Sequence, residues 1–114
     1  MRHALLLVLA IFGLGGCSSP TPISVENRAG VLLRSVVVSG DGFTQDLGDI
    51  QPGATARADV HPSGESGLSI AFTASGKRVE PRFDTYFEGG GRYSVAVAVA
   101  PSLEASADVQ LRPY

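Results

Sequence analysis

Tryptophan is absent from this chain of 114 residues, and cysteine occurs once. A single cysteine excludes an intramolecular disulfide, and it also excludes zinc sites built from several cysteines. Charge is scarce and nearly balanced, with 18% charged residues and a formal net charge of −2. Because a nucleic-acid-binding protein would carry a basic stripe, the composition argues against that class. With 44% hydrophobic residues, a disordered chain is excluded as well.

The hydrophobic run at the start of the chain is too short to span a bilayer. It extends from Ala4 to Leu14 and follows Arg2 and His3. A membrane-spanning helix needs about 20 apolar residues, whereas a shorter run behind a basic residue is typical of a signal peptide. We therefore expect residues 1–16 to be a signal peptide that is not part of the fold.

The only cysteine lies directly after this run, in the sequence Leu14-Gly15-Gly16-Cys17. A leucine, two small residues and a cysteine resemble the lipobox of bacterial lipoprotein precursors. The resemblance implies cleavage between Gly16 and Cys17, a diacylglyceryl group on the Cys17 sulfur and a further acyl chain on its amine. In Gram-negative lipoproteins an aspartate after the cysteine favours inner-membrane retention. Ser18 stands there in this chain, so the resemblance implies an outer-membrane anchor that faces the periplasm.

Residues 17–22 are expected to be the lipidated cysteine and a short linker, because prolines and hydroxyl side chains cannot build a core. Fully extended at ~3.3 Å per residue, residues 18–22 span roughly 17 Å, which keeps the domain close to the bilayer. No polybasic cluster is present to bind an anionic membrane surface, so the acyl chains are the expected anchor. Two alternatives remain: Cys17 is an ordinary small residue near a conventional cleavage site, or the first segment is an uncleaved anchor.

From Ile23 onward, apolar and polar residues alternate with the period of two that is typical of β-strands. The clearest strand covers residues 93–99, where a tyrosine and valines occupy one face and small residues the other. Pro81 predicts an edge strand or an interrupted strand. The polar pair Arg34 and Ser35 interrupts an apolar run and predicts a bulge in a central strand.

Turn signals separate these runs roughly every 8–12 residues. Among them, residues 75–76 and the three glycines at 89–91 each predict a hairpin. A parallel sheet would need helical crossovers, for which the sequence shows no convincing pattern. The sequence therefore predicts an all-β fold over residues 23–114: a small antiparallel β-sandwich of seven or eight strands with immunoglobulin-like or transthyretin-like architecture. A small β-barrel is the alternative.

Residues suited to catalysis or metal binding are few. His61 is the only histidine after the expected cleavage site, and the loop around it lacks the spacing of a nucleophile elbow. Asp41, Asp46 and Asp49 surround two glycines, but their spacing does not match an EF-hand, and turns favour Asp and Gly for other reasons. We expect no enzyme, no metal site and no cofactor beyond the covalent lipid on Cys17.

One group of residues suggests a binding role. Tyr86, Phe87 and Arg92 surround the three glycines and are predicted as an interaction loop, because exposed aromatics and arginine anchor protein interfaces. The competing interpretation is that Phe87 and Tyr93 belong to the core and that the glycines only turn the chain. The sequence thus predicts a non-enzymatic accessory lipoprotein of the bacterial envelope with a protein partner. The alternative is a binder or inhibitor of a soluble ligand, such as a polysaccharide or an attacking hydrolase.

Overall fold

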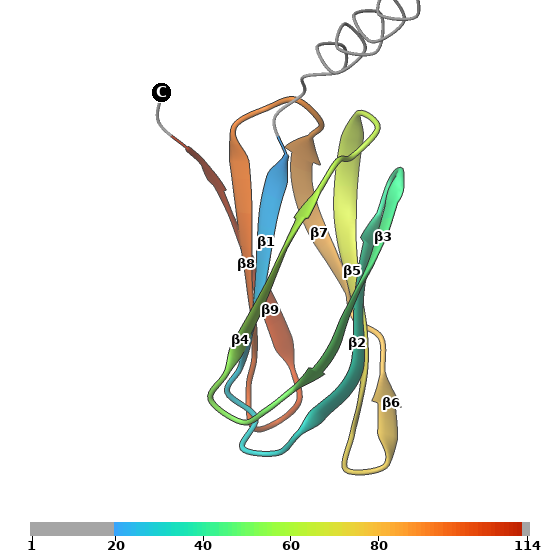
Figure 1. The fold of residues 1–114 in the computed structure, drawn as a ribbon, viewed down its shortest axis with the longest axis vertical. Coiled ribbons are helices and arrows are strands. Elements are labelled where there is room, and N and C mark those ends of the chain that lie inside the picture. Colours follow the sequence, from blue (N-terminus) through green and yellow to red (C-terminus); the bar gives the residue numbers. More distant parts are fainter. Residues whose placement is uncertain (1–19, 113–114) are drawn as a thin grey trace, which may run out of the picture.

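The computed structural model describes residues 20–112, which form nine β-strands in two packed sheets (Figure 1). In chain order the strands are β1 (Thr21–Asn27), β2 (Leu33–Gly40), β3 (Phe43–Ile50), β4 (Thr55–Val60), β5 (Glu65–Ala74), β6 (Lys77–Val79), β7 (Arg82–Glu88), β8 (Tyr93–Val99) and β9 (Ala105–Leu111). Sheet A has the order β4-β1-β8-β9, and sheet B has the order β3-β2-β5, with β6 and β7 both paired to β5. The arrangement confirms the predicted β-sandwich and is not a closed barrel.

Neighbouring strands in this part of the chain run antiparallel except for β1 and β8, which are parallel. Both of these strands start at the end of the sandwich where the β4–β5 and β7–β8 connections lie, at the top of Figure 1. We call this end the loop end and the opposite end the far end. Residues 20–112 contain no helix that is long and apolar enough to cross a membrane.

The core lies between the sheets and is built from the inward-facing residue of each alternating pair. In β5 the buried residues are spaced two apart, and in β8 the valines of the predicted face are buried. The completely or almost completely buried apolar residues are Ile23, Val25, Leu33, Val36, Val38, Ile50, Val60, Leu68, Ile70, Phe72, Ala74, Phe87, Val95, Val97 and Val99. Burial of such side chains stabilises the fold by about 1.5–3 kcal/mol each, so the alternation seen in the sequence determines which face of each strand packs inward.

The predicted bulge lies in β2 at Arg34 and Ser35. Between Leu33 and Val36, three steps along β2 match two steps along β3. The extra residue shifts the alternation, so that Leu33 and Val36 are both completely buried although they are three residues apart. Ser35 has a left-handed φ of 49°, and its N–H donates to Asp49 Oδ1 at 2.9 Å. A side-chain acceptor thus satisfies the backbone donor that the bulge removes from the ladder.

The outer edge of β5 is covered by an interrupted strand, as Pro81 predicts. β6 pairs with the last residues of β5 and β7 pairs with the first, and Glu80 and Pro81 separate them. Proline has no N–H to donate to a ladder, but the Pro81 carbonyl still accepts the Ile70 N–H at 3.1 Å. The count of nine strands, against seven or eight expected, includes both halves of this interrupted edge.

The domain begins earlier than predicted. Thr21 and Pro22, expected in the linker, are the first residues of β1 and pair with Val60 and Asp59 of β4. Pairing with β8 begins only at Ile23, so the missing N–H of proline falls at the start of the strand, where it is tolerated. The predicted linker must therefore end before Thr21. The predicted signal peptide, the cleavage site at Gly16 and the lipidated Cys17 lie outside the described residues.

Asn27 is a completely buried polar residue at the far end of β1. Its Nδ2 donates to the carbonyl oxygens of Val31 at 2.7 Å and of Ile50 at 2.9 Å. Its Oδ1 accepts the N–H of Ala29 at 2.8 Å, and its backbone bonds to the β3–β4 connection. One side chain thus joins β1 of sheet A to the end of β3 in sheet B and holds the turn between β1 and β2.

We predict that Asn27→Ala lowers the free energy of unfolding by about 3 kcal/mol, because it leaves buried carbonyl and N–H groups without partners. Urea denaturation followed by circular dichroism measures the change. Gln110→Ala is the matched control, since the Gln110 amide is exposed and donates to Asp108 at the surface. This control should change stability by less than about 0.5 kcal/mol. Similar losses in the two variants would contradict the role of Asn27.

Candidate functional site

The loop end carries the residues that the sequence singles out for binding. It contains the β2–β3 turn, the β4–β5 and β7–β8 connections, the start of β1 and the end of β9 (Figure 1). Backbone hydrogen bonds tie these connections together: Ser63 N–H donates to the Asp41 carbonyl and Gly89 N–H to the Gly64 carbonyl, both at 3.0 Å. The three connections therefore form one continuous surface.

The three glycines at 89–91 do not form the predicted hairpin. β7 pairs with β5 in sheet B, whereas β8 pairs with β1 and β9 in sheet A, so residues 89–92 carry the chain from one sheet to the other. A Cβ on Gly89 would overlap the carbonyl oxygen of Pro62. At this position glycine permits a close approach between two connections, and the sequence pattern alone does not distinguish that use from a tight turn.

Phe87, predicted as part of the interaction loop, is a core residue. Its side chain is completely buried, and its ring centroid lies 6.4 Å from that of Phe43 with an interplanar angle of 47°. The prediction of an exposed binding role is therefore wrong for Phe87. The physical reason is the alternation of β7, in which Phe83 and Phe87 face inward while Tyr86 faces outward.

Tyr86 remains at the surface, with half of its area exposed. Its hydroxyl donates to Glu88 Oε1 at 2.6 Å, and its ring meets the Tyr93 ring edge-on, with centroids 6.4 Å apart and planes at 85°. The hydrogen bond to Glu88, together with partial desolvation and the negative charge of that carboxylate, raises the pKa of Tyr86 to about 12. Glu88 thus fixes the orientation of the phenol and keeps it protonated.

Leu111 continues this surface on the other side of Tyr93. The two residues are partners in the β8–β9 ladder, and Leu111 is 70% exposed because it lies at the open end of the sandwich. We call Tyr86, Tyr93 and Leu111 the apolar strip. By the alternation of β9, Leu111 lies on the same face as Ala107 and Val109, which are half-buried. Its pairing with the first residue of β8 is what leaves it uncovered.

Two arginines lie beside the apolar strip. Arg112 N–H donates to the Arg92 carbonyl, which extends the β8–β9 ladder past its last strand residue. The Arg112 Nη2 donates to the carbonyl of Pro20 at 3.3 Å. Arg92, predicted as part of the interaction loop, is half-buried at this end of the domain. Arg112 links the last strand of the domain to the residue that precedes its first strand.

The remaining sequence candidates have structural roles or lie apart. His61 is exposed at the end of β4. Asp46 Oδ1 accepts the Gly48 N–H at 2.8 Å, and Asp49 binds the bulge in β2 as described above. These two aspartates therefore hold irregular backbone in β3 and β2. Within residues 20–112, no group of three or more His, Cys, Asp or Glu side chains is placed to hold a metal ion.

The outer face of sheet A carries a shallow trough. A hollow of about 490 Å³ crosses β4, β1, β8 and β9, and an adjoining one of about 210 Å³ shares three of its lining residues. The strand register places Arg57, Ser24, Ala96 and Asp108 in one row across the four strands. In this row the small side chains of Ser24 and Ala96 form the floor of the outer trough, and opposite charges stand on its two edge strands. Farther along, Glu26 and Arg28 also line the trough.

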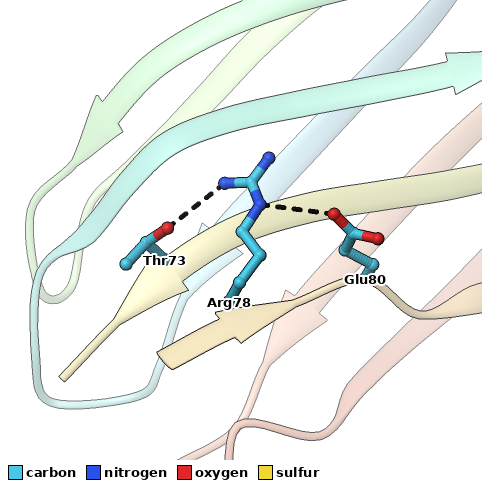
Figure 2. Close-up of polar contacts among 3 residues, drawn as sticks. All are labelled: Thr73, Arg78 and Glu80. Carbon is cyan, nitrogen blue, oxygen red and sulfur yellow. Dashed lines mark hydrogen bonds and ion pairs between the residues drawn. The ribbon is translucent and has the colours of Figure 1, made fainter. Parts of the chain in front are cut away.

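The outer face of sheet B is also hollowed. Arg78, Glu80 and Arg82 lie along the edge of this sheet that β6 and β7 form. A hollow of about 310 Å³ is lined by Asp41 and Arg82 together with glycines, two serines, Leu68 and Phe83. Farther along, Arg78 pairs with Glu80 at 3.4 Å and donates to Thr73 Oγ1 at 3.3 Å (Figure 2). Exposed pairs of this kind contribute little stability, so they mainly set the charge pattern of the face.

Gly89→Ala should destabilise the domain by about 2–4 kcal/mol, because the added methyl group forces the β4–β5 and β7–β8 connections apart. Thermal unfolding measured by circular dichroism reports the loss. Gly67→Ala is the control: a Cβ there meets the nearest atoms, two carbonyl oxygens of β7, at 3.7 Å, an ordinary contact distance. If both alanine variants unfold at the wild-type temperature, the close approach at Gly89 is not needed.

Glu88→Gln should lower the pKa of Tyr86 from about 12 toward the ordinary value of about 10, because the neutral amide no longer disfavours the phenolate. Since the folded-state pKa is raised, the phenol stabilises the fold below pH ~10, and this contribution is lost as the pH rises through about 12. Tyrosinate absorbance measured against pH tests the shift. Asp108→Asn removes a distant carboxylate and should leave the titration unchanged; an equal shift in both variants contradicts the assignment.

No family model matches the chain, and no curated protein matches it. Among solved structures, the chain is similar to an NMR structure of a protein from Eubacterium rectale, with a TM-score of 0.58 and 11% sequence identity. The similarity covers 82% of this chain and 91% of that chain. At this sequence identity the similarity shows a shared fold alone, and the shared fold covers almost the whole of the other chain.

Proposed function

We propose that this protein is a lipid-anchored accessory protein of the bacterial cell envelope, held in the outer membrane through Cys17 and active through contact with another envelope protein. The observation that carries the proposal is the lipobox-like sequence Leu14-Gly15-Gly16-Cys17, placed only a few residues before the first strand. The only cysteine of the chain occupies the position that lipidation requires.

The short sequence separation between Cys17 and the first strand supports this proposal. Residues 18–20 separate Cys17 from the start of β1, and Pro20 is held by Arg112. A tether of this length keeps the loop end near the bilayer surface. The two sheet faces and the far end then point into the periplasm, where a partner can reach them.

The outer trough supports a protein as the partner. Strands in a sheet lie about 4.8 Å apart, so the row from Arg57 to Asp108 spans roughly 14 Å, which accommodates one helix or strand pair of a partner. In the row of Ser24 and Ala96 the floor side chains are too short to fill this space, and the charged residues that line the trough can select the direction of the bound element. Without a partner, small residues on the outer face of a central strand are disfavoured, because β-branched and aromatic side chains pack better on a sheet surface.

A second function, as a binder or inhibitor of a soluble ligand, is favoured by the hollow on sheet B. Ser39, Asp41, Ser69 and Arg82 line about 310 Å³ there and present both charges and two hydroxyl groups within a small concave surface. Small-molecule sites combine such a surface with a few polar groups of fixed position. This hollow faces away from the outer trough, so the two functions can be tested separately.

The proposal is tested in cells grown with radiolabelled palmitate, using a photo-crosslinking residue in place of Ala96 in the outer trough. We expect the label in this protein and one discrete crosslinked envelope protein. Cys17→Ser should lose the label, because a hydroxyl is a much poorer nucleophile than a thiolate, and should lose the crosslink when the protein leaves the membrane.

The matched control carries the same crosslinking residue at Ala71, on the outer face of sheet B. It should not capture the protein found at Ala96. Label retained by Cys17→Ser, or absent from the wild-type chain, contradicts the anchor. Anchored protein without a crosslink at Ala96 contradicts the partner and favours the second function.

A further inference from the structure

Exposed apolar side chains are concentrated at the loop end. In residues 20–112 the exposed large apolar residues are Val31, Tyr86 and Leu111, at 37%, 50% and 70% exposure. Val31 lies at the far end, whereas Tyr86 and Leu111 flank Tyr93 in the apolar strip. The most exposed apolar surface of the domain is therefore at the end where the chain enters the fold.

The tether enters the fold beside this strip. Arg112, which follows Leu111, donates to the carbonyl of Pro20. From Cys17 to Pro20 the backbone can extend by about 10 Å at most, at ~3.3–3.6 Å per residue. The headgroup region is roughly 5–8 Å thick on each side of the bilayer, taking the difference between its total thickness and its hydrocarbon core. With acyl chains on Cys17, the loop end cannot leave the neighbourhood of the headgroups.

We propose that the apolar strip, together with Arg92 and Arg112, is a lipid-contacting surface that rests on the headgroups of the membrane holding Cys17. The inference depends on the proposed lipid anchor and adds an orientation to it. Tyrosine is favoured at membrane interfaces because its ring is apolar and its hydroxyl is polar, and arginine can bond to lipid phosphates. The hydroxyl of Tyr86 is already paired with Glu88, so its ring edge and Leu111 form the apolar contact.

The charges at this end indicate which force holds the surface to lipid. Glu65 and Glu88 face each other in the β5–β7 ladder, close to Tyr86. Together with Asp41 in the β2–β3 turn they outnumber the two arginines, so the loop end is not a basic patch. Contact therefore depends on the apolar strip and on the tether, and we expect it to change little with salt. The sandwich stands on its loop end and exposes both outer faces.

Tryptophan fluorescence can test the orientation, because the chain contains no tryptophan. The full lipidated chain is reconstituted in vesicles of phosphatidylethanolamine and phosphatidylglycerol that contain lipids brominated near the top of their acyl chains. Leu111→Trp and Tyr86→Trp place a single emitter in the strip, and Val31→Trp places one at the far end. Mass spectrometry first establishes whether Cys17 carries acyl chains.

We expect bromolipid to quench the emitter at positions 111 and 86 several-fold more strongly than at position 31, and to the same extent at low and high salt. Acylated, vesicle-bound protein with equal, weak quenching at all three positions overturns the lipid-contacting surface and leaves the anchor intact; the strip is then open to a protein partner. Absence of acyl chains on Cys17 overturns the anchor, and the orientation with it.

Discussion

Asn27 closes the far end of the sandwich by bonding to three backbone groups with one side chain. No apolar residue could replace it, because the turn after β1 and the end of β3 would then bury backbone groups without partners. In a medium of low polarity such bonds are stronger than in water, and their loss costs more. The position of sheet A over sheet B at this end therefore depends on an amide as well as on apolar packing.

The loop end is held in a related way but by different groups. The Ser66 hydroxyl accepts the Asp41 N–H at 3.0 Å and donates to the Gly67 carbonyl at 2.7 Å, while backbone bonds join the neighbouring connections. Apolar side chains fill the space between these two polar ends. The sandwich is thus an apolar core with hydrogen-bonded connections at each end. A substitution at either end therefore first disturbs the hydrogen bonds of the connections, and the packing of the core only as a consequence.

The features of the fold that could be predicted are those that depend on neighbouring residues. Alternation predicted the buried face of β8, the polar pair in β2 predicted the bulge, and Pro81 predicted the interrupted edge. Features that depend on distant pairing were missed. Thr21 and Pro22 belong to β1 because β4 pairs with them, and nothing in their own composition indicates this. The crossover at residues 89–92 was missed for the same reason.

The residues of the loop end were also predicted only in part, because some of their positions depend on local alternation and others on the pairing of distant strands. Tyr86 lies at the surface of the loop end and Arg92 is half-buried there, whereas Phe87 is in the core. The alternation that places Phe87 on the same face as Phe83 already contained that information. Leu111 could not be found from sequence, because its exposure results from where β9 ends relative to β8. The lipobox-like sequence remains a prediction that the fold neither requires nor contradicts.

The parallel pairing of β1 has a mechanical consequence. β1 lies between β4 and β8, with six register pairs to one and five to the other, and the tether joins it at Thr21. A pull on the tether acts along the strand axis and must shear both ladders at once, whereas a pull on an edge strand would separate its pairs one after another. Shear loads many hydrogen bonds together, so under the proposed lipid anchor a pull from the membrane would load both ladders of β1 together rather than pair by pair.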